Sequence, residues 1–489
     1  MNQALPAGAV DAAAELLSRR TGLVFPEPRR RALADGMGKA LGRAGDVDAY
    51  LTRLATEAAL FDELVAEVTV GETYFFREPE QVAAIRNRVL PDLGRHVGGR
   101  PLRIWSAGCA SGEEPYTLAI LALEAGLADR VHILATDLSR AALARAQRAR
   151  YTRWSLRATP AEACARYFRQ SQGEFELVPS VRELVEFGYH NLAADAYPSL
   201  CNGIWGIDLI LCRNVLIYLD PATIARVARQ LLATLTPGGW LVLGASDPPL
   251  ADFAPCDVVI TDAGLLYRRR RPGKSQSPRH DLDWRRSPSE PWKPVAEPTP
   301  ELVVPEAQRP APVVPPAPDP QPDPEEAVQA YLRGDYERAG FLASRVTARP
   351  DAPAGVWVLL VRATANRGEL EAAGKACMAG LERHPTCAEL LYLHGLLLAQ
   401  GGHLNQAVIA LRGALYLDRA LAVAHLTLGQ ILARLGERDG ARRSLRNAGR
   451  VLSQMPAAET VPAGDGECAG RLGEMARVHL ALLTEPVGQ

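Results

Sequence analysis

The chain lacks the features of a disulfide-bonded, zinc-binding or membrane-spanning protein. Its 489 residues include eight cysteines, none of them in a C-x-x-C pair, which argues against a disulfide framework or a zinc site. No apolar run reaches the ~18 residues that a spanning helix needs, and the N-terminus lacks the basic-then-apolar order of a secretion signal. We therefore expect a cytoplasmic protein with reduced thiols, no metal and no membrane insertion.

An excess of either charge is also missing. Lys and Arg number 55 and Asp and Glu 56, for a net charge of −1, so no overall field points to nucleic acid or an anionic membrane. The length exceeds that of one hydrophobic core, which predicts several domains. Prolines make up 16 of the residues in 272–324, and such a stretch is typical of an extended, disordered linker.

A repeat follows this proline-rich stretch. Glycines recur every 34 residues, and each is followed five residues later by an alanine; the pairs are Gly334 and Ala339, Gly368 and Ala373, Gly402 and Ala407, and Gly436 and Ala441. A helix–turn–helix unit of 34 residues resembles the tetratricopeptide repeat (TPR). We expect TPRs over residues 325–456, a C-terminal helical tail over 457–489, and an unidentified protein or peptide partner on the concave face.

The most informative segment is Arg103–Tyr116, which reads as a buried strand, a glycine turn and the start of a helix. Gly108 and Gly112 would let the backbone approach a ligand, and the spacing is not that of the G-x-G-x-x-G dinucleotide motif. Glu113 and Glu114 at the helix start would repel a pyrophosphate and attract an ammonium group. S-adenosylmethionine carries an ammonium, ribose hydroxyls and no phosphate, so the segment predicts a methyl-donor site.

Asp137 supports this prediction. It ends the next predicted strand, 25 residues after Gly112, where an acid holds ribose hydroxyls in nucleotide-binding sheets. The alternative is that Asp137 only caps the following helix. Helices are expected upstream, in 8–70, and alternating strands and helices over 102–268. Residues 165–190 predict a small β insertion with a hairpin near Gln172 and Gly173.

Three further segments complete a pattern: Gly71–Glu78, Glu186–Leu192 and Cys212–Leu219. Together with the glycine turn and Asp137, they resemble the chemotaxis receptor methyltransferases (CheR family), over roughly residues 10–271. That family transfers methyl groups from S-adenosylmethionine to glutamate side chains of receptors. One departure is Gly71, where some members carry Asn.

The resemblance implies a role for each matching residue. Thr73 and Arg77 would close over the methionine end of the cofactor, and Glu114 would hold its ammonium. Asp137 would hold the ribose. The remaining residues would frame the adenine (Asn191, Leu192), line the floor below the sulfur (Arg213, Asn214) and border the reaction centre (Tyr218). Arg77 and Tyr218 are the predicted catalytic residues, and S-adenosylhomocysteine is the expected product.

The residue chemistry favours a carboxylate acceptor. A glutamate with a pKa of ~4.3 is already ionised at neutral pH, so it needs an orienting cation and no general base. Arg77 and Arg213 provide guanidinium groups, which match a carboxylate; Arg213 could instead pair with a structural acid. The expected substrate is the cytoplasmic helical bundle of a methyl-accepting chemoreceptor. The alternative is a TPR scaffold whose methyltransferase domain binds cofactor or receptor without turnover.

The expected architecture is therefore an α/β, Rossmann-like methyltransferase joined by a Pro-rich linker to an α-helical TPR array. Its predicted parts are an N-terminal helical domain (1–75), the methyltransferase domain (76–271) with its β insertion, the linker, the repeats and the tail. If the array only docks the target, deleting residues 325–456 should weaken target selection and leave cofactor affinity intact.

Overall fold

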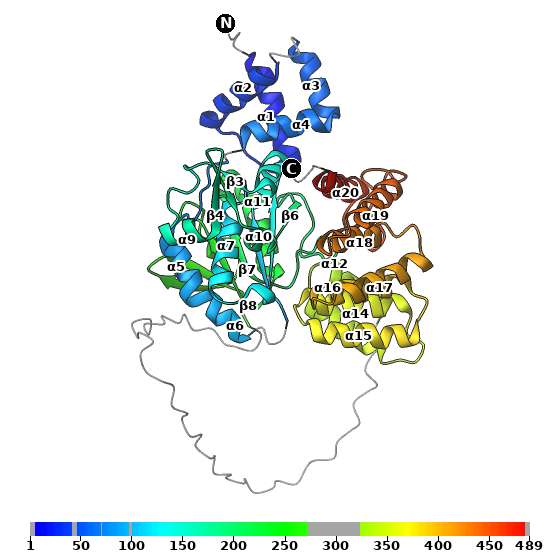
Figure 1. The fold of residues 1–489 in the computed structure, drawn as a ribbon. Helices are drawn as coiled ribbons and strands as arrows, with labels where there is room; N and C mark the ends of the chain where they lie inside the picture. Colours follow the sequence, from blue (N-terminus) through cyan, green and yellow to red (C-terminus); the bar gives the residue numbers. More distant parts are fainter. Residues whose placement is uncertain (1–4, 42–45, 70, 97–99, 272–322, 485–489) are drawn as a thin grey trace, which may run out of the picture.

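The computed structural model describes residues 5–41, 46–69, 71–96, 100–271 and 323–484. Figure 1 shows a helical N-terminal part, a central α/β part and a C-terminal helical array. The predicted linker lies outside the described residues except for its last two. There Asp323 accepts a hydrogen bond from the amide of Glu325, so the first array helix begins at Pro324, inside the predicted linker.

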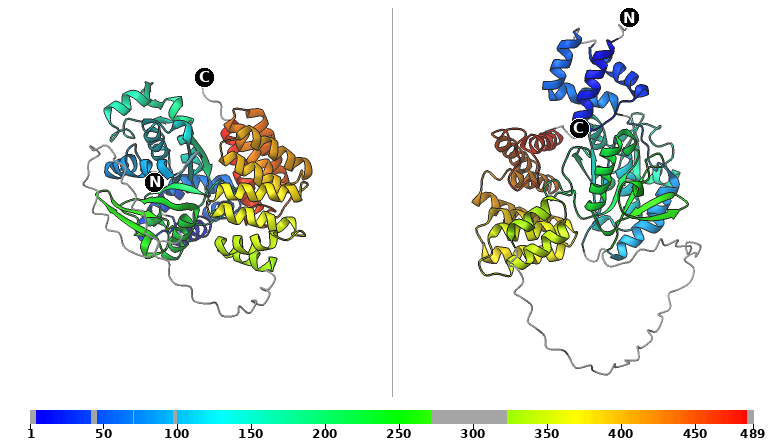
Figure 2. Two further views of the ribbon diagram at one scale, coloured as in Figure 1. Left: turned by 90° about the horizontal axis from the view of Figure 1, so that it is seen from below. Right: turned by 180° about the vertical axis from the view of Figure 1, so that it is seen from behind.

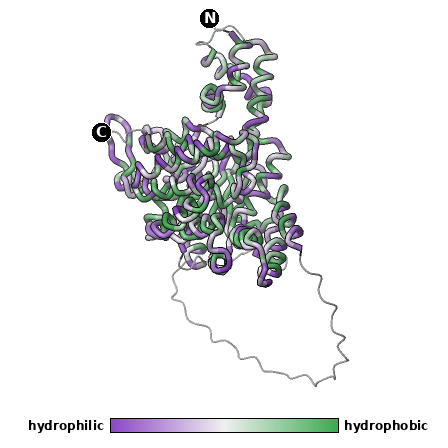
Figure 3. The backbone as a smooth tube through the Cα atoms, turned by 90° about the vertical axis from the view of Figure 1, so that its right-hand side faces the viewer, coloured by the Kyte–Doolittle hydropathy of each residue, from purple (hydrophilic) through white to green (hydrophobic). Residues whose placement is uncertain are grey.

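The N-terminal domain contains four helices: α1 (Ala7–Thr21), α2 (Glu27–Leu41), α3 (Val47–Thr56) and α4 (Ala58–Val68). Figure 3 shows hydrophobic and hydrophilic residues alternating along these helices, as amphipathic helices require. Their buried side chains, such as Leu17, Leu33 and Leu64, join one hydrophobic core with Trp105 and Ile210 of the central sheet. The N-terminal domain therefore packs against the methyltransferase domain.

The central sheet has seven strands in the order β6-β2-β1-β7-β8-β10-β9. Their bounds are β1 (Leu102–Ala107), β2 (Val131–Asp137), β6 (Val185–Tyr189), β7 (Ile207–Cys212), β8 (Leu235–Leu243), β9 (Asp257–Thr261) and β10 (Gly264–Arg268). The first five strands in this order are parallel, and β10 pairs antiparallel with both β8 and β9. The order reverses between β1 and β7, the switch point where such sheets bind ligands.

Helices cover both faces of this sheet, and alternating side chains of its strands enter two different cores. Trp105 packs with α11 (Pro221–Thr234) and the N-terminal domain, whereas its neighbour Ile104 packs on the opposite face. That second face carries α5 (Pro79–Ala84), a π-helical turn (Ile85–Val89), α6 (Leu90–His96) and α7 (Glu113–Glu124). α8 (Arg140–Arg148) follows β2.

The β insertion is smaller than predicted and differently bounded. Three strands form it, β3 (Arg150–Tyr151), β4 (Phe168–Ser171) and β5 (Glu174–Leu177). The short helix α9 (Ala161–Tyr167) lies between β3 and β4, and the short helix α10 (Pro179–Arg182) follows β5. Gln172 and Gly173 both have positive φ, 52° and 84°, as a two-residue hairpin turn requires. The prediction that the insertion extends to residue 190 is wrong, because β6 pairs with β2 in the main sheet.

The array consists of four helix pairs followed by α20 (Ala469–Thr484). The pairs are α12 (Pro324–Leu332) and α13 (Tyr336–Thr347), α14 (Ala354–Asn366) and α15 (Leu370–Arg383), α16 (Ala388–Gln400) and α17 (Leu404–Leu417), and α18 (Ala422–Arg434) and α19 (Arg438–Leu452). The four repeat glycines have φ between 77° and 83°, which ends each first helix in the left-handed region. The four alanines are fully buried where paired helices meet, so the 34-residue period is that of a TPR array.

The array lies beside the methyltransferase domain in all the views of Figures 1 and 2. Trp205, which precedes β7, joins the core of the array with Tyr392 and Leu396 of α16. α20 contacts β6, and Arg140 of α8 pairs with Glu474 of α20. The first helices of the repeats therefore face the methyltransferase domain. No helix in the described part of the chain is long and apolar enough to cross a membrane.

Candidate active site

A cavity of about 200 Å³ opens at the carboxyl ends of β1 and β7, at the switch point of the sheet. Six of the predicted site residues line it: Thr73, Arg77, Glu114, Arg213, Asn214 and Tyr218. They come from three distant segments of the sequence, so the fold brings the predicted residues together. Gly108, Cys109 and Ala110 of the glycine turn complete one wall.

The two glycines of the turn have different roles. Gly108 lines the cavity with φ of 83°, and a Cβ there would lie 2.5 Å from a methyl group of Val215. Gly112 has φ of 96° and faces protein, since a Cβ would lie 2.9 Å from that of Ala146 and 3.0 Å from the hydroxyl of Tyr151. The expectation that Gly112 lets the backbone approach a ligand is therefore wrong: it lets α7 start close against α8.

Glu114 presents the acidic group of the cavity. Its side chain accepts a hydrogen bond of 2.7 Å from the hydroxyl of Ser106 and one of 3.2 Å from Arg213. Burial raises its pKa, and the nearby Arg213 opposes that shift. Glu113 instead points into the protein, where Ser111 donates to it at 2.8 Å. Of the two acids at this helix start, only Glu114 lines the cavity and suits an ammonium group.

Arg213 is held by several partners. Its guanidinium lies 3.2 Å from Glu114 and 3.4 Å from Glu78, and it donates to the carbonyl of Arg77 at 2.8 Å. Only 5% of its side chain is exposed. Because two carboxylates of the chain already occupy this guanidinium, the arrangement favours the alternative in which Arg213 pairs with structural acids over a role in orienting the acceptor.

Arg77 belongs to a strained segment at the mouth of the cavity. Phe76 and Glu78 on either side of it have φ of 57° and 58°, values that cost free energy in residues other than glycine. The amide of Phe76 donates to the hydroxyl of Thr117 on α7 at 3.1 Å. Arg77 itself donates to the carbonyl of Glu72 at 2.8 Å, and no carboxylate among the described residues forms an ion pair with it.

The floor of the cavity depends on Asp247, which sequence reasoning missed. Its carboxylate accepts hydrogen bonds from the amides of Asn214 at 2.5 Å, Gly244 at 2.9 Å and Ile217 at 3.3 Å. These bonds hold Asn214 at φ of 58°. Gly244 is needed because a Cβ there would lie 2.8 Å from the amide nitrogen of Asn214. The signal in the sequence is an acid shortly after the end of the buried strand β8, separated from it by Gly244, Ala245 and Ser246.

Asp137 ends β2 beside the glycine turn. One carboxylate oxygen accepts from the amide of Ala110 at 2.8 Å and the other from the amide of Ser139 at 2.7 Å. Burial raises the pKa of Asp137, and these amides oppose the shift. The cap of α8 is Ser139, whose hydroxyl accepts from the amide of Ala142, so the alternative that Asp137 only caps this helix does not hold. Each oxygen retains a lone pair for a hydroxyl donor.

Asn191 and Leu192 follow β6, next to Asp137, but do not line the cavity. The amide of His190 donates to the carbonyl of Asp137 at 3.2 Å, which places this segment at the same edge of the sheet. The side chain of Asn191 turns away, donating to the carbonyl of Arg20 at 2.8 Å and accepting from the amide of Ala193 at 3.0 Å. Its amide donates to Asp195 at 2.6 Å, so Asn191 would shape an adenine site through the position of its backbone and not through a free N–H.

Tyr218 joins the cavity to the N-terminal domain. Its carbonyl accepts from the amide of Val24 at 2.9 Å, and the guanidinium of Arg29 on α2 lies 4.6 Å from the centre of its ring. Tyr218 is thus fixed on one side by the helical domain while its other side lines the cavity.

The residues around the cavity fit S-adenosylmethionine. A buried carboxylate suits its ammonium, a second acid at the next strand tip suits its ribose, and Gly108 keeps the turn at the cavity wall in a conformation that a side chain would disrupt by contact with Val215. No cluster of three or more metal-binding side chains occurs among the described residues. Fold and site together define an S-adenosylmethionine-dependent methyltransferase.

Comparison with known proteins shows to which family of methyltransferases the chain belongs. Residues 71–250 match the family described as "CheR methyltransferase, SAM binding domain". The chain is 31% identical over 430 residues to the probable biofilm formation methyltransferase WspC of Pseudomonas putida, covering 86% of this chain and 92% of that protein. It is 34% identical over 267 residues to chemotaxis protein methyltransferase 1 of Pseudomonas aeruginosa, covering 52% of this chain and 95% of that protein. The chain belongs to the CheR methyltransferase family.

Proposed function

We propose that this enzyme transfers the methyl group of S-adenosylmethionine to glutamate carboxylates on the cytoplasmic helical bundle of a chemoreceptor, forming methyl esters. The proposal rests on two observations: the chain belongs to the CheR methyltransferase family, and an arginine at the cavity can bind a carboxylate acceptor. The relative that matches both the methyltransferase domain and the array is named for biofilm formation, whereas the relative that matches about half of this chain is named for chemotaxis. We therefore propose a cytoplasmic chemosensory pathway that controls biofilm formation.

The observation that supports the acceptor most directly is the contrast between the two arginines at the cavity. Arg213 is occupied by Glu78 and Glu114, while Arg77 contacts a backbone carbonyl and the ring of Tyr74. A guanidinium that forms no ion pair with a carboxylate of the described residues, at the mouth of a methyl-donor site, can orient an incoming carboxylate through two parallel hydrogen bonds. Arg77 is thus the proposed acceptor-binding residue.

When bound, S-adenosylmethionine supplies a methyl group on a positively charged sulfur. Glu114 would hold the ammonium, Asp137 the ribose, and the backbone of Asn191 and Leu192 the adenine. Since a glutamate acceptor is ionised at neutral pH, the protein only has to bring one carboxylate oxygen into line with the methyl group and exclude water. Arg77 would orient that carboxylate, with Tyr218 packed beside the reacting atoms.

The test uses S-adenosylmethionine with an isotopically labelled methyl group and purified cytoplasmic fragments of chemoreceptors. Label that is transferred to a fragment and released as methanol by mild alkali indicates a carboxyl ester. Label that stays bound under alkali would contradict the proposal, as would a lack of transfer to every receptor fragment of the source organism when the cofactor binds.

Arg77→Ala should lower kcat/KM for the receptor about 100-fold, since a charge-assisted hydrogen bond contributes about 1.5–3 kcal/mol. The assay is run at saturating cofactor so that any loss of cofactor affinity does not enter the rate. Arg166→Ala is the matched control, because Arg166 is exposed on α9. Equal rates for Arg77→Ala and the control would remove Arg77 from the proposed site.

The array is proposed to select the target, but its inner surface already contacts the rest of this chain. Arg362 of α14 pairs with Asp465, donates to the carbonyl of Ala463 at 2.9 Å and lies 2.8 Å from Glu389. Asp465 in turn accepts from the amide of Leu200 in the methyltransferase domain at 3.0 Å. An external partner would therefore have to bind the exposed part of the array or displace the residues around Ala463 and Asp465.

A further inference from the structure

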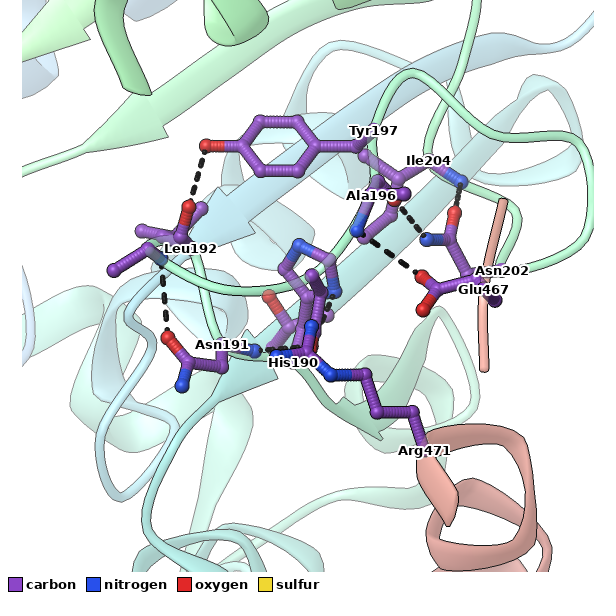
Figure 4. A network of polar contacts seen from close by, with 12 residues as sticks. His190, Asn191, Leu192, Ala196, Tyr197, Asn202, Ile204, Glu467 and Arg471 are labelled. Atoms are coloured by element: carbon purple, nitrogen blue, oxygen red, sulfur yellow. Dashed lines mark hydrogen bonds and ion pairs between the residues drawn. The ribbon is translucent and has the colours of Figure 1, made fainter. Parts of the chain in front are cut away.

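The C-terminal segment, which comprises the residues that lead into α20 and the first turn of that helix, forms polar contacts with one loop of the methyltransferase domain. This loop, residues 190–206, follows β6. Asp465 accepts from the hydroxyl of Ser199 at 3.2 Å. Glu467 accepts from the amide of Ala196 at 3.2 Å, and Arg471 pairs with Asp195. Figure 4 shows Glu467 and Arg471 directed from the C-terminal segment toward this loop. The loop is the one that begins with the predicted adenine residues Asn191 and Leu192.

Asp195 connects the two sides of this interface. One of its carboxylate oxygens faces Arg471. The other accepts from the backbone amide of Asn191 at 2.6 Å and lies 3.3 Å from Nδ1 of His190. A single buried carboxylate, 9% exposed, therefore binds the array on one side and the backbone of the adenine segment on the other.

The surroundings of Asp195 make Arg471 its main source of positive charge. His190 is buried, and burial lowers its pKa, which leaves the ring neutral near pH 7. Glu467 is a second acid close enough for Asp195 to raise its pKa. Without Arg471, the Asp195 carboxylate would face an acid and a neutral ring in a buried position, an arrangement that is costly. Turning toward solvent would relieve it and would break the bond to the amide of Asn191.

The loop is otherwise packed on the centre of the sheet. The rings of His190 and Tyr197 contact each other at 5.1 Å and contact Trp105 of β1 at 5.9 and 5.6 Å. Trp105 donates to the hydroxyl of Thr136, at the end of β2, at 3.0 Å. The sheet therefore constrains the loop on its inner side, and Arg226 of α11 donates to the carbonyl of Ala193 at 2.6 Å. The Asp195 side chain is the part of the loop that is held by the array.

We infer that the array positions the adenine side of the cofactor site, with Arg471 as a positioning residue that acts through Asp195 on the backbone of Asn191. Docking of the C-terminal segment raises the affinity of the methyltransferase domain for S-adenosylmethionine and S-adenosylhomocysteine, and release of the array lowers it. This inference rests on the proposed placement of the adenine at Asn191 and Leu192. It makes the array a regulator of the cofactor site as well as a candidate docking surface.

The test is calorimetric titration of S-adenosylhomocysteine into the full chain. Arg471→Ala should raise Kd about tenfold, equivalent to about 1.4 kcal/mol, and Arg471→Lys should recover most of the affinity because it keeps the charge. Arg450→Ala is the matched control: it removes an exposed arginine of α19 that hydrogen-bonds Asn447 within the array. A Kd for Arg471→Ala within twofold of the control would overturn the inference.

Two further measurements separate positioning from general destabilisation. Hydrogen exchange of the ligand-free protein should quicken at the amides of Asn191 and Ala196 in Arg471→Ala and stay unchanged in α7. Asp195→Asn combined with Arg471→Ala should weaken binding no more than the stronger single variant, as coupled residues do. Fully additive effects would contradict the path through Asp195. Failure of the wild-type chain to bind would instead refute the proposed cofactor site itself.

Discussion

The two ends of the proposed cofactor site differ in which parts of the chain hold them. The acidic group at the methionine end is held by residues of the methyltransferase domain, whereas the loop at the adenine end is also contacted by the array. Around Glu114, the partners are Ser106 and Arg213, both within that domain. Around Asn191, the partner Asp195 is held by Arg471, far along the chain. The contacts at the methionine end thus stay within one domain. At the adenine end, the contact between Arg471 and Asp195 is the inferred route by which the array influences the site.

Arg213→Ala tests the methionine end and should have the largest effect. It leaves Glu78 and Glu114 without their cation in a buried site, which should cost about 3–5 kcal/mol in the free energy of unfolding, measured by urea denaturation. Arg86→Ala is the control, because Arg86 and Glu124 form a largely exposed pair expected to contribute less than about 1 kcal/mol. Similar losses for the two variants would mean that Arg213 is not a structural centre of the site.

Asp137→Ala tests the region between the two ends. Loss of a carboxylate that accepts ribose hydroxyls should raise the Kd for S-adenosylhomocysteine about 100-fold, as expected from charge-assisted hydrogen bonds of about 1.5–3 kcal/mol each. Titration calorimetry measures the change. A Kd within threefold of wild type would show that the ribose is held elsewhere.

The adenine end should respond to pH through Glu467. Burial, reinforced by Asp195 and opposed by Arg471, raises the pKa of Glu467 to about 7. An acid with a raised pKa favours folding when it is protonated, so its stabilisation is complete below about pH 4.3 and is lost as pH rises through about 7. The free energy of unfolding of wild type should therefore fall relative to that of Glu467→Gln over this range, by at most about 4 kcal/mol. Parallel pH curves for the two proteins would contradict this.

Ser139→Ala should have the smallest effect and serves as the counterpart of Asp137→Ala. It removes the cap of α8, which should lower stability by about 1 kcal/mol, measured by thermal unfolding. The Kd for S-adenosylhomocysteine should stay within about twofold of wild type. A large loss of affinity would indicate that Asp137 acts through the helix start and not on the ligand.

The contacts of Glu467 and Arg471 with the loop change the expected result of removing the array. Deleting residues 325–456 was expected to leave cofactor affinity intact if the array only docks the target. Because Arg471 and Glu467 lie on the segment supported by those repeats, and both contact the loop of Asn191, the deletion should lower cofactor affinity as well.

Local patterns in the sequence determined the helical repeats and the residues of the cavity. The glycines and alanines of the 34-residue period act within one helix pair. The glycine turn and Asp137 follow or end parallel strands, and Glu114 lies in the first turn of the helix after that glycine turn. Motifs of this kind are local, so they can be read without knowing the packing.

Only the tertiary structure decided which partners these residues have. It assigned β6 to the main sheet, paired Arg213 with Glu78 and Glu114, placed Asp247 under Asn214, and joined Arg471 to Asp195 across 276 positions of sequence. Ion pairs and buried hydrogen bonds depend on distance and on the removal of water, which arise only when separate elements pack together. The sequence thus contained a methyl-donor site and a repeat array, and their packing joined the two.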